Sequence, residues 1–218
     1  MPRRFELLVF DWDGTLVDSA GAIVAAIQAA ARDLGLAVPD AARARHVIGL
    51  GLHDALAYAL PGLPPAQYPQ VAERYRHHFL PHAASLPLFP GTREMLGALR
   101  ARGHALAIAT GKSRAGLARA LEAAELAGVF QATRAADQCA PKPAAAMLLE
   151  LMAELDVAPE RTLMIGDTSH DLEMAANAGV AALGVSYGAH ERVRLASLAP
   201  LALLESTAAL AQWLARNA

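Results

Sequence analysis

The chain has very little cysteine and very little lysine. Cys139 is the single cysteine in 218 residues, which excludes an intrachain disulfide and predicts a reducing, cytoplasmic environment. Only Lys112 and Lys142 are lysine among the 19 Lys and Arg residues. Where arginine is used so freely, a retained lysine favours a position that needs a compact ammonium group.

The sequence also lacks long apolar runs and a strong net charge. No stretch is long and apolar enough to cross a bilayer, and the start does not read as a secretory signal. The net charge of −2 gives no electrostatic basis for binding nucleic acid or an anionic membrane. With 55% hydrophobic and 18% charged residues the composition is that of a globular protein with a substantial core.

One stretch near the start organises the rest. An apolar run, Leu7 to Phe10, ends abruptly at Asp11 and Asp13. The run predicts a strand buried in a parallel sheet, and ligands bind beyond the carboxyl ends of such strands. Two carboxylates so close together repel each other unless a cation lies between them, and oxygen ligands favour Mg²⁺. The alternative is a strand that ends in an ordinary Asp-Gly turn.

The remaining pattern divides the chain. Residues 18–86 show helical spacing and no buried strand, whereas residues 87–218 alternate strands with helices. Strands are expected near residues 105–109, 162–165 and 180–185, and a weaker, polar one at 131–137 suits a sheet edge. This alternation predicts an α/β fold with a parallel sheet, into which an all-helical block is inserted after the first strand.

Three of the predicted strands end in polar residues. They are followed by Asp11 and Asp13, by Thr110 and Lys112, and by Asp167 and Asp171. Parallel strands place these ends on one edge of the sheet, so three separate motifs are expected to converge on one site.

A phosphoryl group explains this mixture of residue types. Asp11 is suited to be a nucleophile that forms an aspartyl-phosphate. Asp13 would protonate the leaving alkoxide and then deprotonate the hydrolytic water. Thr110 and the Gly111 amide would bind the transferring oxygens, and Lys142 would supply the positive charge that they need.

The same residues predict a metal site. Mg²⁺ would be held by Asp11, Asp167 and a backbone oxygen near Asp13, and it would screen the nucleophile from the incoming phosphate. Asp171 lies four residues after Asp167, so it would face the metal directly or through water.

Four segments together resemble the haloacid dehalogenase superfamily, on its phosphatase side, and most closely the phosphoglycolate phosphatase group. They are Asp11-Trp12-Asp13-Gly14-Thr15, Thr110-Gly111-Lys112, Pro141-Lys142-Pro143 and Gly166-Asp167-Thr168-Ser169-His170-Asp171. The resemblance implies a Rossmann-like core of residues 1–17 and 87–218, a mobile cap of residues 18–86, and Mg²⁺-dependent hydrolysis of a small phosphorylated metabolite. His170 occupies a variable position of its motif and is expected to face solvent.

The resemblance also indicates which cap residues contact the substrate. The substrate-facing loop of such caps tends to carry glycine after a basic residue, which makes Arg45, His46 and Gly49 candidates for contacting the leaving group. The alternative is a solvated helix end.

Two other functions remain open at this point. A phosphoglucomutase-like phosphotransferase shares all four motifs. A non-catalytic protein that binds a phosphorylated ligand would keep the fold, although it would have no chemical need for Asp11, Asp13, Lys142 and Asp167 together. Asp13 disfavours a dehalogenase, which has no alkoxide to protonate.

Overall fold

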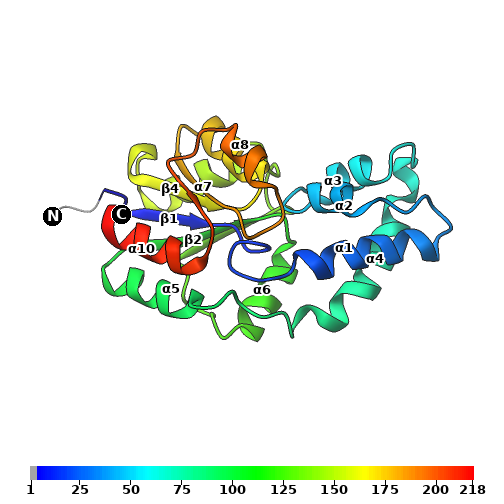
Figure 1. The fold of residues 1–218 in the computed structure, drawn as a ribbon, viewed down its shortest axis with the longest axis horizontal. Coiled ribbons are helices and arrows are strands. Elements are labelled where there is room, and N and C mark those ends of the chain that lie inside the picture. The colour runs from blue at the N-terminus through cyan, green and yellow to red at the C-terminus, as the bar shows by residue number, and fades with distance from the viewer. Residues whose placement is uncertain (1–3) are drawn as a thin grey trace.

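The computed structural model describes residues 4–218 as a six-stranded parallel sheet with helices on both faces and a helical extension at one end (Figure 1). The strands, in sheet order, are β3 (Ala132–Ala135), β2 (Ala105–Thr110), β1 (Leu7–Phe10), β4 (Thr162–Gly166), β5 (Ala181–Val185) and β6 (Leu203–Leu204). The helices are α1 (Ala20–Asp33), α2 (Ala41–His46), α3 (Leu52–Ala59), α4 (Tyr68–Ala83), α5 (Thr92–Ala101), α6 (Arg114–Ala123), α7 (Ala146–Leu155), α8 (Ser169–Asn177), α9 (Arg192–Ala196) and α10 (Thr207–Asn217), with short 3-10 turns at Pro65–Gln67 and Pro159–Arg161.

The apolar run of β1 is buried on both faces of the sheet. Leu8 and Phe10 belong to the core cluster that includes residues of α5 and α10. Leu7 and Val9 belong to the opposite cluster, with residues of α7 and α8. Since successive side chains of a strand point to opposite faces, a strand covered by helices on both sides must be apolar throughout.

The strand order places β1 at the centre of the sheet, between β2 and β4. Phe10 lies in register with Ile108 of β2 and with Ile165 of β4. The chain winds in opposite directions from this point, which is where ligands bind in open α/β sheets. The loops after these three strands therefore meet at one edge.

Helices α1 to α4 lie between β1 and β2 in the sequence and beyond the carboxyl edge of the sheet in space (Figure 1). Two adjacent linkers join them to the sheet: the Asp18 N–H donates to the Pro87 carbonyl at 3.0 Å, and the Phe89 N–H to the Leu16 carbonyl at 3.0 Å. The predicted fold class, a Rossmann-like α/β core with an inserted helical cap, is confirmed.

The sheet edges show where the sequence signals are strong and where they are weak. The polar strand expected at residues 131–137 is β3 and does lie at an edge. The opposite edge strand, β6, was not predicted, because two residues are too few to show a periodicity. No helix in residues 4–218 is both long and apolar enough to span a membrane.

Candidate active site

The loop after β1 carries Asp11 and Asp13, and both side chains are almost fully buried. The backbone turns at Gly14 with a φ of +86°, and a Cβ there would lie 2.1 Å from Asp167 Oδ2. Only glycine combines a left-handed backbone with so close an approach. The turn therefore holds the β1 loop against the loop after β4.

The β4 loop supplies two further buried carboxylates. Asp167 accepts hydrogen bonds from the Thr15 hydroxyl at 2.9 Å and from the Ala189 N–H at 2.7 Å. Asp171 forms a capping box at the start of α8, where its Oδ2 accepts from the Thr168 hydroxyl at 2.7 Å and from the Thr168 N–H at 3.0 Å. The fold thus fixes both carboxylates without the help of a ligand.

Lys142 connects the two loops. Its Nζ donates to Asp11 Oδ1 and to Asp171 Oδ1, each at 2.6 Å, and its side chain is fully buried. Burial opposes the charge of Lys142, but the two carboxylates outweigh it and raise the pKa of the ammonium above its usual range. Lys142 is therefore a charged group in the interior of the site.

Negative charge exceeds positive charge at this point. Ligand oxygens of Asp11, Asp167 and Asp171 lie within 4.8 Å of one another, and Lys142 is the ammonium that contacts this cluster. Burial raises the pKa of Asp11 to about 7, against the attraction of Lys142. Burial and the neighbouring Asp11 and Asp171 also raise the pKa of Asp167. A cation bound in the cluster would offset the repulsion among these carboxylates.

One oxygen identifies where such a cation fits. Asp11 Oδ2 is buried and has no hydrogen-bond partner among residues 4–218. A buried carboxylate oxygen without a partner is costly, so it indicates a missing ligand. The donors are all oxygens, which suits a hard divalent cation rather than a thiophilic one.

Asp13 has a different partner. Both of its oxygens accept hydrogen bonds from Lys112 Nζ, at 2.9 and 2.8 Å, and this ammonium also lies 5.0 Å above the ring of Phe79 on α4. The sequence does not reveal this ion pair, because the two residues are 99 positions apart and only the meeting of the β1 and β2 loops brings them together.

Thr110 and Gly111 lie at the end of β2, beside these carboxylates. The Thr110 side chain is buried, and its hydroxyl accepts the Lys112 N–H at 3.2 Å. A Cβ on Gly111 would lie 2.6 Å from the carbonyl oxygen of Gly49. The glycine loop between α2 and α3 therefore packs directly on the β2 loop, and residue 111 has to be glycine for this contact.

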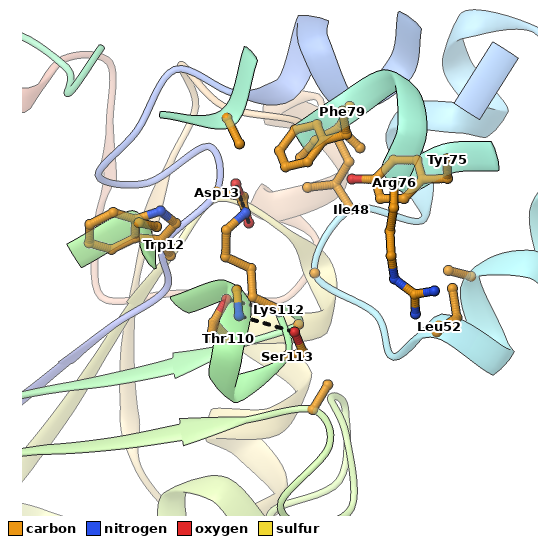
Figure 2. Close-up of a pocket in the computed structure, with 18 of the residues that line it drawn as sticks. Trp12, Asp13, Ile48, Leu52, Tyr75, Arg76, Phe79, Thr110, Lys112 and Ser113 are labelled. Atoms are coloured by element: carbon orange, nitrogen blue, oxygen red, sulfur yellow. Dashed lines mark hydrogen bonds and ion pairs between the residues drawn. The ribbon is translucent and has the colours of Figure 1, made fainter. Parts of the chain in front are cut away.

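A cavity of about 690 Å³ opens from these loops toward the cap helices. Asp11, Asp13 and Thr110 line it, together with side chains of α1, α3 and α4. Figure 2 shows Asp13 on the loop after β1, Thr110 at the end of β2, and Tyr75 and Phe79 on α4. Gly49, a predicted substrate-facing residue, also lies on the cavity wall. Arg45 is exposed on α2, and it is not among the described residues that line the cavity.

His46 also lies outside the lining, where its carbonyl joins the cap to the core. The Nε2 atoms of His170 and His190 lie 2.8 and 3.1 Å from that carbonyl oxygen. His190 Nδ1 accepts the Ser169 N–H at 2.9 Å, so this ring carries its proton on Nε2 and donates it to His46. Through these hydrogen bonds His170 and His190 join the core to the His46 carbonyl of the cap.

The expectation that His170 faces solvent is wrong. The side chain is buried, and burial lowers its pKa. The sequence could not show this, because the groups that cover His170 come from α2 and from the loop after β5.

The architecture and these four loops can now be compared with known proteins. A family model of haloacid dehalogenase-like hydrolases matches residues 8–185. The chain belongs to this family.

Its relatives include phosphatases. A protein of Dickeya dadantii named "Probable phosphatase IndB" is 40% identical, over 92% of this chain and 89% of its own length. A phosphoglycolate phosphatase of Rhodospirillum rubrum is 36% identical, over 98% of this chain and 91% of its own. The structure of a haloacid dehalogenase-like hydrolase from Streptococcus pneumoniae superimposes with a TM-score of 0.84 at 25% identity, and covers 96% and 98% of the two chains. The predicted enzyme class, a phosphomonoester hydrolase, is confirmed.

Proposed function

We propose that the chain hydrolyses small phosphomonoesters, such as phosphoglycolate, with Mg²⁺ and through an aspartyl-phosphate on Asp11. The proposal rests on the position and the contacts of the Asp11 carboxylate. It follows the central strand and lines the cavity, and Lys142 holds one of its oxygens while the other has no partner in residues 4–218. We assign the attack on the entering phosphoryl group to this carboxylate.

Two proton transfers at Asp13 complete the reaction. Asp13 would be protonated in the enzyme–substrate complex. Asp11 then forms a bond to phosphorus as the ester P–O bond breaks, and the departing alkoxide takes this proton from Asp13, which is left as a carboxylate. Asp13 then takes a proton from a water molecule, whose oxygen attacks the same phosphorus and releases phosphate and the free Asp11 carboxylate. The ion pair with Lys112 would hold Asp13 at this position.

The remaining loop residues would bind the phosphoryl oxygens. The Thr110 hydroxyl and the Gly111 N–H are hydrogen-bond donors at the end of β2, and Lys142 contributes its buried positive charge. These groups are fixed before the substrate arrives, which makes them effective in a transition state whose charge is spread over several oxygens.

Mg²⁺ would be held by Asp11, Asp167 and the backbone oxygen of Asp13, with Asp171 beside it directly or through water. It supplies positive charge that orients the phosphoryl group and offsets its repulsion from Asp11. In the described structure the oxygens of Asp171 already accept from Lys142 and Thr168, which favours the water-mediated contact.

We further propose that residues 18–86 act as a cap that moves relative to the core formed by residues 1–17 and 87–218. The linkers lie side by side at Asp18 and Pro87, so a rotation there would open the cavity. The contact of the Gly49 loop with Gly111 would then re-form on closure and exclude water from the site.

The direct test is phosphate release from 4-nitrophenyl phosphate. Turnover with Mg²⁺ that is abolished by EDTA supports the proposal, and its absence under saturating Mg²⁺ would favour a non-catalytic phospho-ligand-binding protein. A screen of phosphoglycolate, sugar phosphates and nucleoside monophosphates then ranks the substrates. Transfer of phosphate between sugar positions without its release would indicate a mutase instead.

Calcium should bind this site and support little turnover. Ca²⁺ accepts higher coordination numbers and longer bonds than Mg²⁺, which would disturb the alignment of Asp11 with phosphorus. We expect kcat with saturating Ca²⁺ to be a few per cent of the value with Mg²⁺ at most, on the order of the hundredfold cost of a misplaced reacting group. Added Ca²⁺ should also inhibit the Mg²⁺ enzyme competitively. Equal turnover with both cations would contradict this account.

Magnesium should stabilise the protein more at pH 8 than at pH 5.5. The pKa of Asp11 rises from 3.8 to about 7 in the metal-free fold, so this group's contribution to stability is lost as the pH rises toward 7. At pH 8 Mg²⁺ binds the ionised carboxylate, whereas at pH 5.5 it must displace a proton. The Mg²⁺ concentration is the same at both pH values and is a hundredfold above the Kd measured at pH 8. We expect this concentration to raise Tm by about 5–10 °C at pH 8, and by clearly less at pH 5.5, where Mg²⁺ binds more weakly.

The comparison is made with and without Mg²⁺ at each pH and at equal ionic strength. Burial lowers the pKa of His46 and His190 to about 4. These two groups therefore increase the stability of the fold as the pH rises toward 6.5, in the opposite direction to Asp11. This contribution cancels in the difference. An increment from Mg²⁺ that does not depend on pH would mean that Asp11 is not a ligand.

A further inference from the structure

The cavity beside Asp11 is lined by Asp11, Asp13 and Thr110 where the loops after β1 and β2 meet. The wall on the cap side is largely aliphatic and aromatic, although it also carries Arg76 of α4. Its apolar side chains include Ile27, Ile48, Leu56, Val71, Tyr75 and Phe79. Figure 2 shows Ile48, Tyr75 and Phe79 together on the side of the cavity that faces Asp13. A group that leaves from a phosphate at Asp11 would enter these apolar surroundings.

Two leucines of the lining are exposed to an unusual degree. Leu52, at the start of α3, is 46% exposed, and Leu80 on α4 is 45% exposed. Exposed apolar surface that lines a concave site is characteristic of a place where an apolar group binds, because covering it releases the water around it.

The ammonium of Lys112 is already paired with both oxygens of Asp13. Arg76 and Arg119 also line the cavity but are exposed, and the guanidinium of Arg76 is directed toward Leu52 (Figure 2). A carboxylate that lay against Ile48 or Phe79 would cost free energy unless its charge were paired, whereas an alkyl or aryl group would not.

We propose that the preferred phosphomonoester carries an apolar leaving group, an aliphatic or aromatic alcohol that occupies the cap side of the cavity. This inference rests on the proposed function and narrows its substrate class away from phosphoglycolate. The phosphate lies at Asp11, the ester oxygen at Asp13, and the carbon body between Phe79, Ile48 and Leu52. A cavity of about 690 Å³ is large enough to enclose such a ligand.

The test uses ethyl, butyl and hexyl phosphate beside phosphoglycolate. The three alkyl esters release primary alkoxides of similar basicity, so the chemical step is matched and only the contact with the cavity changes. We expect kcat/KM to rise by about fourfold for each added methylene, the factor that corresponds to the transfer free energy of a buried CH₂ group. Hexyl phosphate should then exceed ethyl phosphate on the order of a hundredfold, and should also exceed phosphoglycolate.

Matched variants locate the effect. Leu52→Gln and Leu80→Gln should each flatten the dependence on chain length, because they place an amide where the hydrocarbon binds. Leu149→Gln is the control: Leu149 is 51% exposed on α7 and lies outside the cavity lining, so this variant should keep the wild-type dependence.

The outcomes separate this inference from the proposed function. Turnover of 4-nitrophenyl phosphate together with a flat chain-length series, or with a preference for phosphoglycolate, overturns the apolar leaving group and leaves the phosphatase intact. An equal loss of slope in Leu149→Gln also overturns it, because the effect would not arise in the cavity. If no phosphomonoester is hydrolysed with Mg²⁺, the proposed function is wrong and the inference falls with it.

Discussion

Asp11→Asn should abolish turnover, with a fall in kcat of about 10⁴-fold or more, the size of loss seen when a nucleophile is removed. The asparagine amide has nearly the shape of the carboxylate but is not nucleophilic. In the described structure Asp11 Oδ1 accepts from Lys142 and Oδ2 has no partner, so the change removes the reacting oxygen without removing packing. The rate of phosphate release from 4-nitrophenyl phosphate measures the loss.

The same variant should be at least as stable as the wild type when metal is absent. Burial raises the pKa of Asp11 to about 7, and a neutral amide avoids the cost of burying this charge while its oxygen still accepts from Lys142, which keeps Asp171 as a charged partner. Asp18→Asn serves as the control, because Asp18 is exposed beyond the loop; it should keep wild-type kcat. Retention of more than about one per cent of kcat in Asp11→Asn would mean that another group attacks phosphorus.

A covalent intermediate gives an independent measure. Rapid acid quenching during turnover should leave a phosphoryl group on the peptide that contains Asp11, and this adduct should be missing in Asp11→Asn. Since Asp13 is held by Lys112 in a separate ion pair, a phosphoryl group found on Asp13 instead would exchange the roles of the two carboxylates.

The fold class and the residues that gather around Asp11 were predictable, because their signals are local. Each of the three central strands is an apolar run that ends abruptly in polar residues. Parallel pairing then brings the ends together without any knowledge of side-chain contacts. Asp11, Thr110 and Asp167 meet for this reason.

The contacts between cap and core were not predictable, because they depend on how the helical insertion meets the sheet. Nothing in the sequence places the His46 carbonyl against His170 and His190, which lie 124 and 144 residues further along the chain. The basic residues Arg45 and His46 stood out by type, yet the structure turns Arg45 to solvent and uses His46 in this contact. The apolar wall of the cavity was not predictable either, because its residues are of the same types that form ordinary helix cores.

The two lysines illustrate both cases. The sequence set Lys142 and Lys112 apart, because arginine is used at every other basic position. Lys142 was expected inside the site, where the structure has it. Lys112 was expected at the same edge of the sheet, and the structure shows that it contacts Asp13 directly. Residue type thus indicated that an ammonium was needed, but only the fold shows which carboxylate it pairs with.

Lys142→Arg should lower kcat by about 10²-fold or more, although the charge is retained. Lys142 is fully buried, and its Nζ lies 2.6 Å from both Asp11 and Asp171. The guanidinium is larger and planar, so it cannot occupy this point without displacing the carboxylates. A displacement of Asp11 by about 1 Å is enough for a loss of this size.

Lys112→Arg is the matched control. Lys112 lies on the cavity wall with its side chain 14% exposed, and a guanidinium can still pair with both oxygens of Asp13 and stack on Phe79. We expect its kcat to stay within about tenfold of the wild type, since the Lys112 side chain is partly exposed and a guanidinium can extend toward the cavity. The Tm of each variant shows whether it is folded at the assay temperature.

Lys142→Met separates the two contributions of Lys142, its charge and its size. It keeps an unbranched side chain of similar length and removes the ammonium, so Asp11 and Asp171 lose their shared partner. Its kcat should fall at least as far as that of Lys142→Arg, because an unscreened Asp11 repels the phosphate. Wild-type kcat in either Lys142 variant would remove this residue from the phosphoryl site, and with it the argument that the loops after β1 and β4 act together with the Lys142 segment.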